Sequence, residues 1–115
     1  MLNEEKICAF CEALPLCYKD FPFGEEWTVF RHVGNKKIFC MLYTREGALR
    51  LNLKCDPLYA DFLRQTHKSV TPGYRMNKTH WNTVAIDGAI SDDEVLSMVA
   101  HSYEITRPKR GLKSK

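Results

Sequence analysis

The chain has 115 residues and a formal net charge of +3, with 44% hydrophobic and 27% charged residues. That length fits a single domain, and the composition is that of a globular protein rather than a disordered or fibrous one. No apolar run approaches the roughly 20 residues of a membrane helix, and the acidic start, "MLNEEKICAF", lacks the basic beginning of a signal peptide. We therefore expect a cytoplasmic protein with no membrane partner.

The positive charge is concentrated at one end of the chain. Residues 107–115, "RPKRGLKSK", hold five Lys or Arg and no acidic residue, whereas residues 1–106 hold 12 basic and 14 acidic residues, a net charge of −2. We expect one domain over residues 1–106 and a basic C-terminal tail over 107–115. Such tails contact phosphate groups, or simply keep a protein soluble, and both interpretations stay open.

The cysteines do not form a recognisable site. Their number is odd, their spacing forms no disulfide framework, and the C-x-x-C at residues 8–11 has no second ligand pair for zinc. We expect free thiols that behave as small apolar side chains. The five residues are Cys8, Cys11, Cys17, Cys40 and Cys55.

The first half of the chain predicts one helix and three strands. Asn3 can cap a helix over residues 3–14, and "CYKDFPFGEE" after it is expected to be a loop. Strands are predicted at 27–33, 36–43 and 48–54, with Gly34-Asn35 as a two-residue hairpin turn.

The second half predicts two helices around a hairpin. Asp56 caps a helix that begins at Pro57, with Leu58, Phe62 and Leu63 on its apolar side. A hairpin follows, with one strand at about 70–76, a turn near "NKTH" and a partner strand "WNTVAID". The last helix begins at Ser91, where "SDDE" forms a capping box.

The order α-β(3)-α-β(2)-α predicts a two-layer α+β domain with a five-stranded, mostly antiparallel sheet and helices on one face. The other face then carries Arg50, Asn52 and Lys54, because Leu49, Leu51 and Leu53 alternate with them.

Trp81 joins this open face if its strand is regular, since Val84 and Ile86 have the opposite parity; a bulge at the strand start would reverse that. Aromatic and basic side chains on one sheet face suit the binding of stacked bases and phosphate, and they equally suit a protein interface. In a third interpretation, Trp81 only fills the edge of the core.

No catalytic motif is present. The chain has no glycine-rich phosphate loop, no H-E-x-x-H and no G-x-S-x-G. Its four histidines, at positions 32, 67, 80 and 101, have no metal-ligand spacing. We therefore expect that the protein is not an enzyme and that it has no catalytic residue, no metal site and no cofactor.

Three segments together resemble the MmcQ/YjbR family: "LRLNLKCDPLYADFLRQ", "RMNKTHWNTVAIDG" and "SDDEVLSMVAHSYEIT". The resemblance extends over about residues 3–106. It implies a CyaY-like fold, also similar to type III secretion chaperones, and DNA binding through two hairpins likened to paired wings. A frataxin-like iron role fits poorly, because the first helix offers only Glu4, Glu5 and Glu12 with Lys6 among them.

The resulting hypothesis is a non-enzymatic protein that contacts the phosphates of DNA through basic hairpin turns. The alternative is a protein-interaction or chaperone-like module, or a self-associating one, that uses the open sheet face around Trp81. The residues expected to contact DNA are Lys36, Lys37, Arg50, Lys54, Arg75, Asn77, Lys78, His80 and Trp81.

Overall fold

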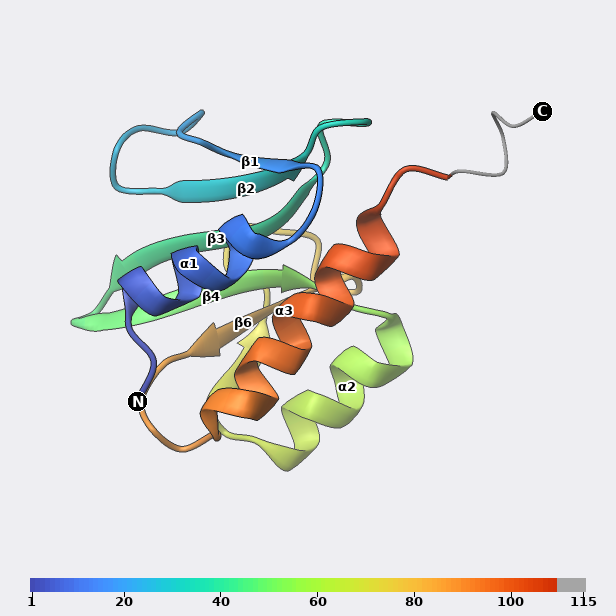
Figure 1. The fold of residues 1–115 in the computed structure, drawn as a ribbon. Coiled ribbons are helices and arrows are strands. Elements are labelled where there is room, and N and C mark those ends of the chain that lie inside the picture. Colours follow the sequence, from blue (N-terminus) through green and yellow to red (C-terminus); the bar gives the residue numbers. More distant parts are fainter. Residues whose placement is uncertain (110–115) are drawn as a thin grey trace.

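A computed structural model describes residues 1–109 of the chain. Within these residues, three helices and six strands form two layers, with the helices across one face of an antiparallel sheet (Figure 1). The strand order is β1-β2-β3-β4-β6-β5. The elements are α1 (Glu4–Ala13), β1 (Cys17–Asp20), β2 (Thr28–His32), β3 (Ile38–Arg45), β4 (Ala48–Lys54), α2 (Pro57–Thr66), β5 (Val70–Pro72), β6 (Trp81–Ala85) and α3 (Asp92–Thr106).

The structure confirms the predicted α+β class and the helices on one face. The core lies between the layers, where Leu42, Leu51 and Val84 of three adjacent strands meet Met98 and Val99 of α3. None of the described helices is long and apolar enough to cross a membrane.

The sheet has a sixth strand that the sequence did not reveal. The stretch expected to be a loop contains β1, which runs antiparallel to β2 with Cys17 opposite His32. At its far end the Arg31 guanidinium binds the Asp20 carboxylate at 2.9 Å. An edge strand with one neighbour needs little apolar sequence, and Tyr18 and Lys19 are both exposed, so the hydrophobic pattern was too weak to detect.

The β2–β3 connection is longer than a two-residue turn. It is centred on Gly34 and Asn35 as predicted, but β2 ends at His32 and β3 begins only at Ile38. Lys36 adopts a left-handed backbone (φ 62°), and its N–H donates to the carbonyl of His32. The Asn35 side-chain amide donates to the Thr106 carbonyl at the end of α3, so the connection is tied to the helical layer.

The strand expected over residues 70–76 stops at Pro72, and residues 73–80 form a loop that leaves the sheet edge. We call this segment the 73–80 loop. It begins at Gly73, whose N–H donates to the Trp81 carbonyl at 2.8 Å. The two backbones approach so closely that a Cβ on Gly73 would lie 2.7 Å from the Cβ of Trp81.

All three predicted helix caps are present: Asn3, Asp56 and Ser91 each accept a backbone N–H of the first turn. The predicted apolar side of α2 is confirmed only for Leu63, however. Leu58 and Phe62 are 84% and 58% exposed, and the buried residues are Ala60 and Leu63. The helix covers the β5–β6 edge of the sheet, so only one narrow ridge faces the core.

The five cysteines are free thiols, as expected. Burial raises the pKa of Cys55 to about 11 and also raises the pKa values of Cys8 and Cys17. A hydrogen bond with the Cys11 thiol, together with burial, raises the pKa of Cys40.

The close approach at Gly73 predicts that Gly73→Ala lowers the free energy of unfolding by about 1–3 kcal/mol, because the added methyl group overpacks against Trp81. Urea denaturation measures the loss. The matched control is Thr79→Ala, at an exposed position of the same loop, which should change stability by no more than about 0.5 kcal/mol. Equal stabilities of Gly73→Ala and wild type would contradict the close contact.

The burial of three thiols, together with the raised pKa of Cys55, predicts slow alkylation of the folded protein. At pH 8 a thiol with a pKa of about 11, as in Cys55, is ionised to roughly one part in a thousand. Iodoacetamide followed by mass spectrometry should leave the buried Cys11, Cys40 and Cys55 unmodified in the native protein and alkylate all five cysteines in urea. Rapid native alkylation of Cys55 would show that its site is open.

Candidate nucleic-acid interface

Trp81 lies on the sheet face that points away from the helices. Pairing between β4 and β6 is uninterrupted, with Lys54 opposite Trp81 and Asn52 opposite Thr83. Residues paired in this way project to the same side of the sheet. The strand is therefore regular, and Trp81 shares a face with Lys54 as its parity predicted. Its side chain is half-buried and is not part of the hydrophobic core.

This second face is not open at its centre, contrary to expectation. Asn52 is fully buried there, and its side-chain oxygen accepts hydrogen bonds from the Tyr43 hydroxyl (2.8 Å) and the Thr83 hydroxyl (2.7 Å). Its amide nitrogen donates to the Tyr74 carbonyl, and the Thr83 hydroxyl accepts the Tyr74 N–H. These bonds hold Tyr74, at the start of the 73–80 loop, over the middle of the sheet.

Three rings lie together on this face, and we call Trp27, Tyr43 and Tyr74 the aromatic cluster. The Trp27 and Tyr43 rings stack with centroids 4.1 Å apart and planes 17° apart, and Tyr74 lies 5.8 Å from Tyr43 at 26°. Two guanidinium groups contact the Tyr74 ring: Arg45 at 4.2 Å and Arg75 at 5.3 Å from its centroid. The result is an aromatic platform with positive charge at its edge.

A pocket of about 300 Å³ opens beside the aromatic cluster. It is lined by Phe23, Trp27, Met41, Arg75 and Met76. We call it the Arg75 pocket. Sequence reasoning placed Arg75 among the phosphate contacts, but it missed the pocket and the aromatic cluster, whose members come from three separate segments of the chain.

The predicted cations differ in how available they are. Lys36 and Lys37 are exposed in the β2–β3 connection, and Arg75 is exposed in the 73–80 loop. By contrast, the Lys78 ammonium donates to the Gly73 carbonyl (2.7 Å) and the Met76 carbonyl (3.2 Å), closing the loop on itself.

Two further predicted cations lie along β4. Arg50 is largely buried; its Nε donates to the Arg45 carbonyl, and its guanidinium lies 3.5 Å from the Glu46 carboxylate. Lys54 is half-buried at the strand end.

The remaining predicted residues shape the loop. The Asn77 side chain accepts the N–H groups of Thr79 and His80, and its carbonyl accepts the N–H of Trp81. His80 is exposed, while its carbonyl accepts the Cys55 N–H.

The loop is supported from α2 by Arg64, to which the sequence analysis assigned no role. Arg64 donates from Nε to the Asn82 side chain at 2.7 Å and from Nη2 to the Lys78 carbonyl. Asn82 in turn donates to the Ala60 carbonyl. Because a guanidinium presents several donors in a fixed plane, Arg64 holds the return of the loop against the helix.

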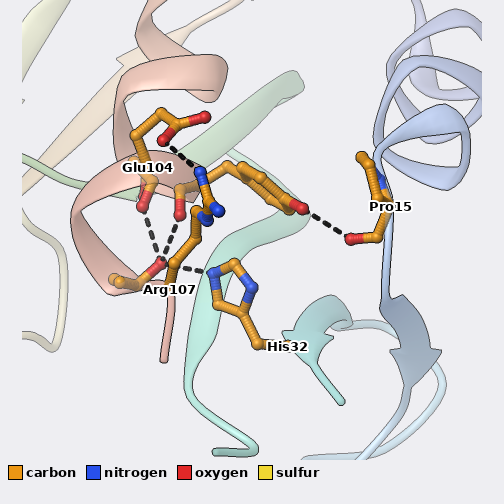
Figure 2. Close-up of polar contacts among 7 residues, drawn as sticks. Pro15, His32, Glu104 and Arg107 are labelled. Atoms are coloured by element: carbon orange, nitrogen blue, oxygen red, sulfur yellow. Dashed lines mark hydrogen bonds and ion pairs between the residues drawn. The ribbon is translucent and has the colours of Figure 1, made fainter. Parts of the chain in front are cut away.

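A second pocket, of about 500 Å³, lies at the end of α3 near the β2–β3 connection, and its lining includes His32, Tyr103 and Arg107. Figure 2 shows His32 bonded to Thr106 (2.8 Å), and the Tyr103 hydroxyl donating to the Pro15 carbonyl (2.5 Å).

The Thr106 hydroxyl donates its proton to the Ser102 carbonyl, so His32 must donate through Nε2. The histidine therefore bridges β2 and α3, and burial lowers its pKa, which favours the neutral ring.

The surroundings of the other histidines fit no metal site. His67 pairs with Glu94 at 2.8 Å, and His101 accepts the Asp56 N–H. Within residues 1–109 no group of three or more His, Cys, Asp or Glu side chains is arranged to hold a metal ion. Of the basic tail, Arg107 pairs with Glu104 at 2.8 Å, whereas its residues 110–115 lie outside the described residues.

Comparison with known proteins decides the family. The YjbR family model matches residues 12–105. The chain belongs to the YjbR family. YjbR of Escherichia coli K12 is 37% identical over 79 residues, which cover 69% of this chain and 67% of that protein. YbdF of Escherichia coli O157:H7 is 35% identical over 92 residues, covering 80% and 74%. Both bear the description "uncharacterized".

Solved structures share the fold. The crystal structure of Deinococcus radiodurans DR2400, which carries the family-model domain DUF419, superposes with a TM-score of 0.85 at 32% identity, covering 99% of this chain and 84% of that one. A Pseudomonas syringae crystal structure gives 0.81 at 25% identity, covering 92% and 100%. The family resemblance inferred from the sequence is thus confirmed, while the relatives supply no activity.

The lowered pKa of His32 predicts a pH-dependent stability. The folded state favours the neutral ring, whereas the histidine of the unfolded chain binds a proton near pH 6.5. The protein therefore has its full stability above that pH and loses stability as the pH falls toward the lower pKa of the folded state. The His32→Gln variant keeps a side-chain donor but does not titrate, so it should lose less stability between about pH 7.5 and 5.5. Urea titrations at each pH measure both proteins, and parallel losses would contradict the assignment.

Proposed function

We propose that this YjbR-family protein binds DNA without catalysing a reaction, and that it contacts phosphates through two exposed loops. The observation that carries the proposal is that both loops leave the sheet at the same end, where β3 begins, β4 ends and β6 begins. From there the 73–80 loop folds back over the sheet face, where Arg75 lies beside Tyr74 and Trp27. Lys36 and Lys37 project from one loop, and Arg75 and His80 from the other.

The backbone of the first loop is fixed while its lysines are exposed. The Lys36 carbonyl accepts a hydrogen bond from the Arg31 guanidinium, and the Asn35 side chain accepts the Lys37 N–H at 3.0 Å. Together with the bond from Asn35 to Thr106, these contacts set the position of both lysines before any ligand arrives. Pre-ordering of this kind reduces the entropy lost on binding.

The charge distribution limits the strength of the contact. Residues 1–106 have a net charge of −2, and Lys78 and Arg50 are engaged within the protein. Three exposed cations therefore remain among the predicted contacts: Lys36, Lys37 and Arg75. Neutralising about three phosphates gives a slope of about −3 for log affinity against log salt, so binding should be weak and salt-sensitive.

A second candidate function is protein interaction, and exposed aromatic side chains favour it. Phe21 is 48% exposed and Phe23 is 58% exposed, beside the half-buried Trp27. Aromatic residues and arginine are enriched where proteins bind one another. This surface lies beside Trp27 rather than Trp81. The simplest protein interaction of this kind is self-association, which light scattering tests. A protein that stays monomeric at all concentrations would exclude it.

The DNA proposal predicts that a short fluorescein-labelled duplex binds with an affinity that falls by roughly 60-fold between about 50 and 200 mM salt. Fluorescence anisotropy measures this. The double variant Lys36→Gln/Lys37→Gln should flatten the slope toward about −1, because one of three phosphate contacts remains.

The matched control for that variant is Lys6→Gln/Lys68→Gln, which removes equal charge from exposed positions outside both loops. It should bind with nearly the wild-type slope. Absence of binding at low salt, or equal effects of the two double variants, would show that these loops do not form a phosphate site.

A further inference from the structure

We propose that the Arg75 pocket takes an unpaired base of single-stranded DNA, with the adjoining phosphate held by Arg75. The inference rests on the proposed function and deepens it, because Arg75 belongs both to the 73–80 loop and to the pocket lining. A strand whose backbone runs along the loop therefore comes directly to the pocket mouth.

The size and lining of the pocket suit a planar apolar group. Its volume of about 300 Å³ lies at the lower end of the range for small-molecule sites. Trp27 and Phe23 offer aromatic surfaces for stacking, and their rings meet edge to face with centroids 6.4 Å apart. Met41 and Met76 complete the lining, and thioether side chains adapt to the outline of a ligand.

The stacking surface is rigid before a ligand arrives. Trp27 is braced by Tyr43, and Tyr43 is fixed in turn by its hydrogen bond to the buried Asn52. Tyr74 lies nearly parallel to Trp27, at 9°, with centroids 6.4 Å apart. Stacking on such a platform needs little side-chain ordering and accepts any base, because every base has an aromatic face.

The charges around the pocket determine on which side of it the phosphate of a bound DNA strand can lie. Arg75 is exposed, and within residues 1–109 it has no carboxylate ion-pair partner, so its guanidinium is available to a phosphate. Arg45 lies over the same Tyr74 ring but is 3.6 Å from the Glu46 carboxylate. On the other side, Glu25 and Glu26 are exposed next to Trp27 and repel a phosphate.

Base access favours a single strand over a duplex. A paired base inside a duplex must be unstacked and rotated out before it can enter a pocket, whereas a base in a single strand is already accessible. Phosphate contacts from the loop alone would not distinguish single-stranded from double-stranded DNA. With the pocket beside them, the site prefers single-stranded DNA.

The test measures how tightly the 115-residue chain binds three probes: oligothymidine, an abasic oligonucleotide of the same length, and the labelled duplex. The abasic probe keeps the phosphates and lacks the bases. Oligothymidine should bind at least about fivefold more tightly than the abasic probe, the lower limit of one stacked base. In protein labelled with 5-fluorotryptophan, only one of the two tryptophan ¹⁹F signals, that of Trp27, should shift on oligothymidine addition.

Variants test the charges around the pocket. Arg75→Gln should weaken oligothymidine binding at least threefold, and Glu25→Gln/Glu26→Gln should strengthen it. Lys6→Gln, an exposed position on α1, is the matched control and should bind as wild type does.

The outcomes distinguish the inference from the function on which it rests. If the abasic probe and oligothymidine bind equally, or if the Trp27 signal does not move, the phosphate contacts stand and the base pocket is disproved. If no probe binds, both proposals fail.

Discussion

The buried amide of Asn52 is the interaction on which the second face of the sheet depends. It lies in the central strand pair with no exposed surface, so each of its polar atoms needs a partner within the protein. Tyr43, Tyr74 and Thr83 supply those partners. A leucine at this position would leave two hydroxyl groups and a carbonyl without their present partner. The network therefore fixes where Tyr74 lies, and with it both the aromatic cluster and the start of the 73–80 loop.

A single bulge brings the aromatic rings together. Next to the β2–β3 connection the strands pair with Arg31 opposite Ile38, but beyond the bulge Phe30 lies opposite Cys40 and Thr28 opposite Leu42. If the register of the Arg31–Ile38 pair continued without a bulge, Phe39 would lie opposite Phe30, and Trp27 would face Leu42 instead of Tyr43. A bulge changes which side chains meet across a pair, and here it creates the stacked pair at 4.1 Å.

These two features also show which parts of the structure could be predicted from the sequence and which could not. The helix caps, the strands with alternating leucines, the parity of Trp81 and the family were accessible, because each is a local pattern in neighbouring residues. The bulge, the edge strand β1 and the polar network were not, because they arise only when separate segments meet. Of the predicted site, Lys36, Lys37 and Arg75 are exposed, as a phosphate contact requires, whereas Lys78 bonds within its own loop. A positive charge in a sequence does not reveal which carbonyl lies beside it.

The self-closure of the 73–80 loop has a consequence for how such a surface diversifies. Its path is held by Asn77, Lys78 and Arg64, which bond to the loop backbone, and by the side chains of Asn52 and Thr83 beneath it. The side chains at positions 75, 79 and 80 are exposed and form none of these supporting hydrogen bonds. The residues that hold the loop in place and those that it exposes are thus different residues of one short segment. The exposed positions can therefore change between related chains while the supporting set, and hence the fold, stays the same.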